Sequence, residues 1–135
     1  MLTKTTSFKQ QITINATPTE LYTQIMDAKK HSKLTNSKVV IKDKMNTEFS
    51  VYDGYAYGKN VELIPNKKIV QTWRAHEDNW NGDILSEITF KFIPINEHKT
   101  KIVFTQKNIP DIVAEQFKKG WTNYYWKPLR RLFNQ

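Results

Sequence analysis

The segment PDIVAEQFKKGWTNYYWKPLRRLF, residues 110–133, decides the fold of this chain. Its apolar and aromatic residues recur at helical spacing, which predicts one long amphipathic helix with a broad aromatic face. So wide an apolar face needs a wide partner, and we expect the helix to pack on a curved sheet. The face is formed by Val113, Phe117, Trp121, Tyr124 and Leu132, with Tyr125 and Leu129 beside them.

Two residues should interrupt this helix. Gly120 lowers the helix propensity of the segment. Pro128 has no backbone N–H and its ring clashes with the preceding turn, so a kink is expected there. The side away from the aromatic face is basic and carries Lys118, Lys119, Lys127 and Arg130.

Most of the chain before residue 110 alternates apolar and polar residues, the pattern of half-buried strands. The Thr17–Glu20 capping box starts a short helix after the first strand, and a second short helix is expected over residues 27–34. Asp53-Gly54 predicts a tight hairpin with positive φ. Strands are predicted around residues 8–14, 39–41, 49–51, 55–63, 69–74, 84–92 and 102–104.

Short connections between successive strands require antiparallel pairing. The order of elements therefore predicts an α+β fold, in which a curved antiparallel sheet wraps around the long C-terminal helix. The length of 135 residues fits one domain, residues 1–135.

The composition narrows the class of protein. There is no cysteine, no signal-peptide pattern and no apolar run long enough to span a membrane, so a cytoplasmic protein is expected. The net charge is +8, but the lysines are spread along the chain, which favours a lysine-rich surface over a nucleic-acid site. The sequence signature of RNA-recognition sheets is also missing.

No catalytic or metal-binding constellation is evident, so neither an enzyme nor a cofactor is predicted. His31, His76 and His98 fall in helix ends or turns, and no nucleophile can be placed beside them. We interpret them as solvated surface residues. The spacing of His76, Glu77, Asp78 and Asp83 fits no known ligand pattern, so this loop is interpreted as solvated and acidic.

The aromatic residues leave two interpretations open. A curved sheet that grips one helix often fails to close, and its aromatic residues would then line an apolar ligand cavity. The same residues could instead form a fully packed core, which the pattern alone slightly favours. The expected lining consists of Tyr57, Gln71, Trp73, Phe90, Phe92, Phe104, Trp121, Tyr124 and Tyr125.

The pattern DGYxxGxxxELxPxxxIVQxWR, residues 53–74, resembles the family of activators of the ninety-kilodalton heat-shock chaperone's ATPase. The resemblance continues at Trp80, Gly82, Ser86 and Gly120-Trp121, and it covers nearly the whole chain. It implies the START-like helix-grip fold of the SRPBCC superfamily, whose members bind lipids and other apolar molecules. It supplies no catalytic residues, because the family shares no catalytic motif.

The resemblance thus implies a non-catalytic module that holds a small apolar or lipid-like molecule between sheet and helix. The resemblance implies that full-length eukaryotic activators carry a separate N-terminal domain that engages the chaperone. We expect no such domain here, so ligand binding is expected ahead of chaperone activation. The alternative is a protein-interaction module related to chaperone ATPase regulation, monomeric or weakly dimeric. In that case the basic outer face of the last helix, with Trp126 and Phe133, would contact the partner.

Overall fold

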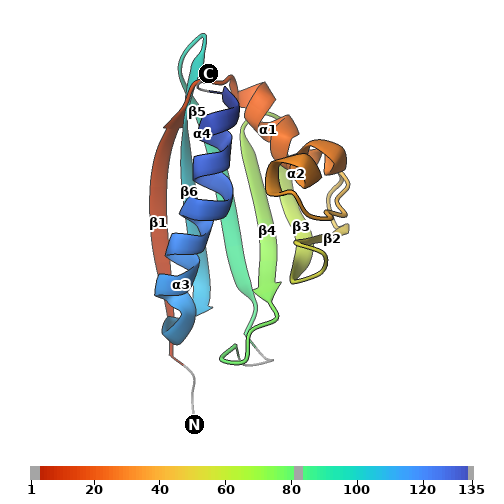
Figure 1. Cartoon of the computed structure of the whole chain (residues 1–135), viewed down its shortest axis with the longest axis vertical. Helices are drawn as coiled ribbons and strands as arrows, with labels where there is room; N and C mark the ends of the chain where they lie inside the picture. The colour runs from red at the N-terminus through yellow and green to blue at the C-terminus, as the bar shows by residue number, and fades with distance from the viewer. Residues whose placement is uncertain (1–3, 81–83, 134–135) are drawn as a thin grey trace.

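The computed structural model describes residues 4–80 and 84–133. Six strands and the helices follow one another in the order shown in Figure 1. The long C-terminal helix consists of two α-helical parts, α3 and α4, joined by a π-helical segment, η1. The elements are β1 (Thr5–Ile14), α1 (Pro18–Met26), α2 (Ala28–Thr35), β2 (Glu48–Val51), β3 (Ala56–Ile64), β4 (Lys68–Ala75), β5 (Ser86–Asn96), β6 (Lys99–Pro110), α3 (Asp111–Trp121), η1 (Thr122–Trp126) and α4 (Lys127–Phe133).

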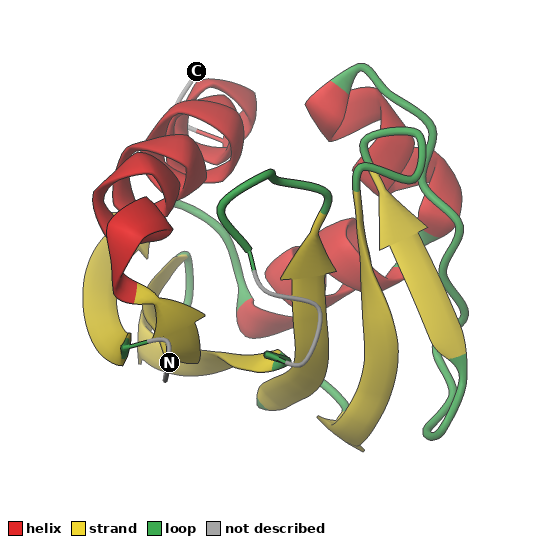
Figure 2. Cartoon of the chain, turned by 90° about the horizontal axis from the view of Figure 1, so that it is seen from below, coloured by secondary structure: helices red, strands yellow, loops and turns green. Residues whose placement is uncertain are grey.

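The strands form one antiparallel sheet in the order β1-β6-β5-β4-β3-β2. The sheet curves around the helices, which all lie on its inner side (Figure 2). This arrangement confirms the predicted α+β helix-grip fold. One predicted strand is wrong: around residues 39–41 the described chain makes only an isolated bridge between Val40 and Ser50. The sheet therefore has six strands, one fewer than the periodicity predicted.

The predicted local signals are confirmed where they depend on short-range hydrogen bonds. The Thr17 hydroxyl accepts from the backbone N–H of Glu20 at 3.1 Å, and the Thr17 N–H donates to the Glu20 carboxylate at 2.9 Å. In the β2–β3 hairpin, Asp53 and Gly54 have φ angles of 55° and 88°. The Tyr55 N–H donates to the Tyr52 carbonyl at 3.0 Å, which closes the predicted primed turn.

The terminal helix departs from the prediction in its second half. It continues through Gly120 without a break, and the irregularity lies just before Pro128. There the Lys127 N–H donates to the Thr122 carbonyl, five residues back. Pro128 cannot donate to the carbonyl four residues before it, and a π turn accommodates a proline at this position.

The π turn rotates the helix face that is buried. An α-helix brings residues three and four apart to one face, but one extra residue per turn shifts the following side chains. Tyr124 and Leu132, predicted on the buried face, are 58% and 51% exposed. Trp126, predicted as a partner contact, is only 3% exposed, and its indole N–H donates to Gln10 at 2.7 Å. It is therefore not available to a partner.

The core between helix and sheet is mainly aromatic. Phe104 lies at its centre, with its ring centroid 4.5 Å from that of Trp121 and 5.1 Å from that of Phe90. Buried side-chain nitrogen and oxygen atoms within residues 4–80 and 84–133 all have a hydrogen-bond partner. The indole N–H of Trp121, for example, donates to the side-chain amide oxygen of Gln106 at 2.9 Å. This part of the molecule is packed by side chains, as the packed-core interpretation expected.

Candidate ligand cleft

A cleft of about 530 Å³ separates the tip of the β2–β3 hairpin from the terminal helix. Trp73 of β4 lies between the two walls. The lining of the cleft is largely aromatic, with a few polar groups from the helix, as is typical of small-molecule sites. The lining residues are Val51, Tyr52, Tyr55, Trp73, Gln116, Phe117, Lys119, Gly120, Trp121, Asn123, Tyr124 and Tyr125.

The hairpin tip reaches across to the helix through Tyr52. Tyr52 has a φ of 51°, a left-handed conformation that is unusual for a bulky residue and stores backbone strain. The Asp53 N–H donates to the Lys38 carbonyl at 3.0 Å and helps to hold this conformation. The Tyr52 ring meets the ring of Tyr124 edge-on, with centroids 5.6 Å apart, and that of Tyr125 at 6.4 Å. A strained aromatic residue thus stands at the wall of the cleft.

Two tyrosine hydroxyls of the cleft, those of Tyr52 and Tyr55, have a raised pKa. Burial raises the pKa of Tyr52 to about 12, with a smaller contribution from Tyr124. Burial also raises the pKa of Tyr55, whose hydroxyl donates to the Glu77 carboxylate. At neutral pH these groups are hydrogen-bonding phenols rather than phenolate bases, so the arrangement suits binding better than proton transfer.

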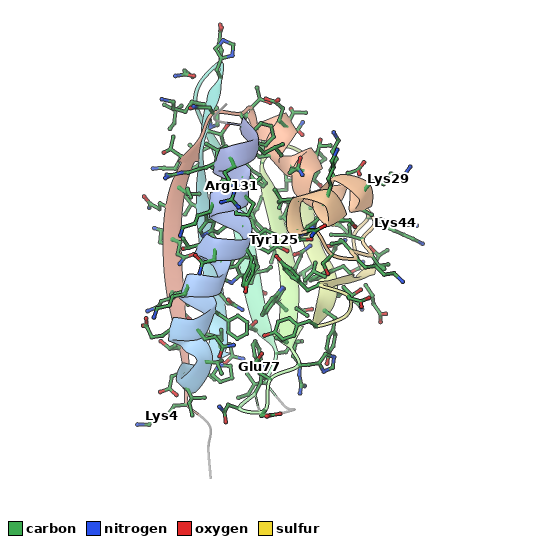
Figure 3. The ribbon with its side chains drawn as sticks, in the orientation of Figure 1. Lys4, Lys29, Lys44, Glu77, Tyr125 and Arg131 are labelled. Atoms are coloured by element: carbon green, nitrogen blue, oxygen red, sulfur yellow. The ribbon has the colours of Figure 1, made fainter. Side chains whose placement is uncertain are left out.

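Behind the cleft wall, Tyr125 contacts α2. Figure 3 shows Tyr125 between the terminal helix and the short helices. Its hydroxyl oxygen lies 2.7 Å from Nε2 of His31, and Nδ1 of His31 lies 2.9 Å from the Ile25 carbonyl oxygen. His31 was predicted to be a solvated surface residue, and this is wrong: it is 3% exposed. The sequence gives no sign of this, since burial of α2 depends on the distant terminal helix.

The structure brings only part of the predicted lining to the cleft. Trp73, Trp121, Tyr124 and Tyr125 line it. Phe90, Phe92 and Phe104 lie instead in the packed core. The π turn places Trp126 over Phe90 and Phe104, whose rings it contacts, and Phe92 is covered by Tyr22 of α1.

Two predicted lining residues have other partners. The Gln71 side-chain amide is buried and donates to Asn60 at 2.9 Å. Gln71 also borders a deeper void of about 10 Å³, which offers room for roughly one water molecule. Tyr57 lies outside the cleft lining, with its ring centroid 5.1 Å from that of His76. The cleft is consequently shallower and nearer to the hairpin than predicted.

Sequence reasoning missed two tyrosines of the cleft, Tyr52 and Tyr55. Both flank the Asp53-Gly54 turn, which was interpreted only as a connection between strands. An aromatic residue on each side of a tight turn was the available signal, because a primed hairpin projects its flanking side chains together.

The remaining predicted features concern metals and membranes. No group of three or more His, Asp or Glu residues that could hold a metal ion occurs in residues 4–80 and 84–133. Asp83 of the acidic loop and Gly82 of the resemblance lie outside the described residues. Within the same ranges, no helix is long and apolar enough to cross a membrane.

Comparison with known proteins identifies the family. The chain is 29% identical over 132 residues to the "Activator of 90 kDa heat shock protein ATPase homolog" of Dictyostelium discoideum, covering 98% of this chain and 33% of that protein. It is 26% identical over 121 residues to the human "Activator of 90 kDa heat shock protein ATPase homolog 1", covering 90% and 35%. The chain thus spans about a third of the length of these relatives.

Solved structures share the fold over nearly the whole chain. The crystal structure of an HSP90 activator from Plasmodium falciparum has a TM-score of 0.86 and 27% identity, covering 94% of this chain and 95% of that one. The solution structure of the Aha1 dimer from Colwellia psychrerythraea has a TM-score of 0.72 and 20% identity, covering 91% and 92%. The family of "Activator of Hsp90 ATPase homolog 1-like protein" matches residues 15–134. The chain belongs to this family.

Proposed function

We propose that this chain is a non-catalytic protein-interaction module that binds an Hsp90-type chaperone and activates its ATPase. The likeness to the Plasmodium falciparum activator carries the proposal, because it covers 94% of this chain and 95% of that one. The chain spans 33% and 35% of the two curated relatives, whereas it matches the Plasmodium falciparum protein over nearly its whole length. A single START-like domain over residues 1–135, acting in the cytoplasm, is part of this proposal.

An ATPase assay tests it directly. Purified Hsp90-type chaperone is mixed with increasing concentrations of the chain, and phosphate release is followed with a coupled enzyme system. We expect the chaperone's rate to rise and to saturate, while the chain alone releases no phosphate above the blank. A chaperone-specific ATPase inhibitor should abolish the increase. An unchanged chaperone rate, together with no complex in analytical ultracentrifugation, would refute the proposal.

The cleft supports a second candidate, the binding of a small apolar molecule. Its aromatic lining, its volume of about 530 Å³ and its neutral tyrosine hydroxyls are the supporting observations. Native mass spectrometry of freshly purified protein, followed by extraction, would identify a bound molecule. A defined mass increment that is lost on denaturation is the expected result.

A pair of variants connects such binding to the cleft. Tyr124 is exposed and lines the cleft, whereas Leu132 is similarly exposed on the same helix but lies outside the lining. We expect Tyr124→Ala to weaken the binding of a fluorescent fatty-acid analogue, and Leu132→Ala to leave it unchanged. Equal affinity of both variants would place the probe elsewhere and remove the cleft from consideration.

A further inference from the structure

The outer face of the sheet carries a groove that the helices leave uncovered. All helices lie on the inner side, so the outward residues of the central strands face solvent (Figure 2). The groove has a volume of about 680 Å³, larger than the cleft beside the terminal helix. Its lining combines aliphatic and charged residues: Lys9, Met45, Val61, Glu62, Lys68, Val70, Glu87, Thr89, Lys91, Val103, Thr105 and Lys107.

The strand register brings like charges together in this groove. Lys68 of β4 pairs directly with Lys91 of β5. Like charges at directly opposite positions destabilise a sheet. Glu62 relieves part of this repulsion, because its carboxylate lies 2.8 Å from the Lys68 ammonium group. In the described part of the chain no carboxylate pairs with Lys91, so the charge conflict is only partly compensated within the molecule.

Two further residue pairs of the sheet show which lysines keep an unbalanced positive charge. Lys107 of β6 pairs with Glu87 of β5, an opposite-charge position in the ladder. Lys9 of β1 pairs with Thr105 of β6, an uncharged residue. The four lysines of the lining outnumber its two glutamates. The groove is therefore basic, with positive charge at Lys9 and Lys91 available to an external anion.

Apolar side chains border the groove at two places, one on β6 and one beside β3. Val61 is 43% exposed and Met45 is 51% exposed, and Val103 lies next to Lys91 in the ladder. Exposed apolar residues among charged ones are a feature of protein contact sites. Among the described residues that line the groove, none is aromatic. Single-stranded nucleic acid needs aromatic platforms on which to stack its bases, and Glu62 and Glu87 would repel its phosphates.

We propose that this groove docks an acidic amphipathic segment of the chaperone that the chain activates. Apolar side chains of the segment would cover Met45, Val61 and Val103, and its carboxylates would pair with Lys9 and Lys91. This inference rests on the proposed function, because it names the surface through which the chaperone is bound. The proposal also explains why Lys68 and Lys91 lie opposite each other, because a carboxylate of the segment beside Lys91 would offset the repulsion between the two ammonium groups.

Two charge-reversal triple variants test the groove. The groove variant carries Lys9→Glu, Lys91→Glu and Lys107→Glu. The matched control carries Lys29→Glu, Lys33→Glu and Lys127→Glu, which are exposed helical positions with the same change in net charge. All six side chains are exposed, so circular dichroism should show both variants folded. Binding to immobilised chaperone is measured by surface plasmon resonance at low and physiological salt.

We expect the groove variant to associate about tenfold more slowly than the unmodified chain and to lose most of its salt dependence, as charges at a contact rim steer association. The control should stay within about twofold. A third variant, Val61→Ser, keeps the charge and should instead raise the dissociation rate. ATPase activation should fall in parallel with binding.

The outcomes separate the groove from the proposed function. If the unmodified chain neither binds nor activates the chaperone, the proposed function fails and the groove loses its partner. If it does both and the two triple variants weaken binding equally, activation stands and the groove proposal is overturned. Binding of a fluorescent single-stranded RNA that the groove variant loses, with chaperone binding intact, would also overturn it by naming a different occupant.

Discussion

The hydroxyl oxygen of Tyr125 lies 2.7 Å from Nε2 of His31, a contact between residues 94 positions apart. The opposite ring nitrogen, Nδ1, faces the Ile25 carbonyl oxygen, which can only accept a hydrogen bond. Nδ1 therefore carries a proton, and because burial lowers the pKa of His31 to about 4, the ring is neutral at pH 7 and Nε2 accepts from the Tyr125 hydroxyl. This contact ties the π segment of the terminal helix to α2.

Stability should depend on pH through His31. Burial lowers the pKa of His31 from 6.5 to about 4, so the unfolded chain binds more protons than the folded chain between these values. The free energy of unfolding is unaffected by this group above pH 6.5 and falls as the pH drops toward 4. The loss amounts to roughly 3 kcal/mol once the shift is fully expressed. Urea denaturation at a series of pH values measures it.

Two variants isolate this contribution. His31→Gln removes the titrating group and should flatten the dependence on pH between 4 and 6.5. His98→Gln, at an exposed hairpin position, should keep the slope of the unmodified protein. If His31→Gln retains the full slope, another group is responsible and the assignment to His31 is wrong.

Tyr125→Phe should destabilise the protein because it removes the hydrogen bond to Nε2 of His31. Without the hydroxyl, Nε2 of His31 becomes a buried acceptor with no donor, which costs about 1–3 kcal/mol. Tyr124→Phe is the matched control, because Tyr124 is 58% exposed and its hydroxyl forms no hydrogen bond with another residue of the described chain. The free energy of unfolding of this variant should change by less than about 0.5 kcal/mol. Chemical denaturation compares the two, and equal effects would contradict the prediction.

The sequence predicted the fold well because its strongest signals are local. The capping box at Thr17 and the hairpin at Asp53-Gly54 involve neighbours in the chain, and period-two alternation needs no tertiary information. The isolated bridge at Val40 was predicted as a strand because two alternating apolar residues cannot distinguish a strand from an extended loop. Which partner pairs with such a segment is decided by the rest of the fold.

The site was harder to predict because it depends on one backbone irregularity. A regular helix of 3.6 residues per turn would place Tyr124 and Leu132 on the inner face. The π turn before Pro128 turns Trp126 inward instead, and Trp126 then helps to enclose Phe90 and Phe104. Hydrophobic periodicity assumes a regular helix and does not predict a π turn, so the predicted cavity lay too deep in the core.

Trp121 should prove to be a stability residue although it borders the cleft. Its ring packs on Phe104 at 4.5 Å, and its indole N–H donates to Gln106. Trp121→Ala should lower the free energy of unfolding by about 3–5 kcal/mol, since it opens a cavity and leaves a buried acceptor unpaired. Thermal unfolding compares it with Leu132→Ala on the same helix. A loss below about 1 kcal/mol would show that Trp121 is dispensable for packing.

Two glycines should respond to alanine in opposite directions. A Cβ atom on Gly58 of β3 would overlap the carbonyl oxygen of Thr72 and lie 2.6 Å from its carbonyl carbon, within the backbone of β4. The two strands would have to separate, so Gly58→Ala should cost about 3 kcal/mol in the free energy of unfolding.

Gly120 is helical, and its Cβ would meet nothing closer than a Tyr124 ring carbon at 4.0 Å. Gly120→Ala should therefore stabilise the protein by about 0.5–1 kcal/mol, through restriction of the unfolded chain. Thermal and urea denaturation measure both variants, and a Gly58→Ala protein as stable as the unmodified chain would show that the strands tolerate a side chain at this position.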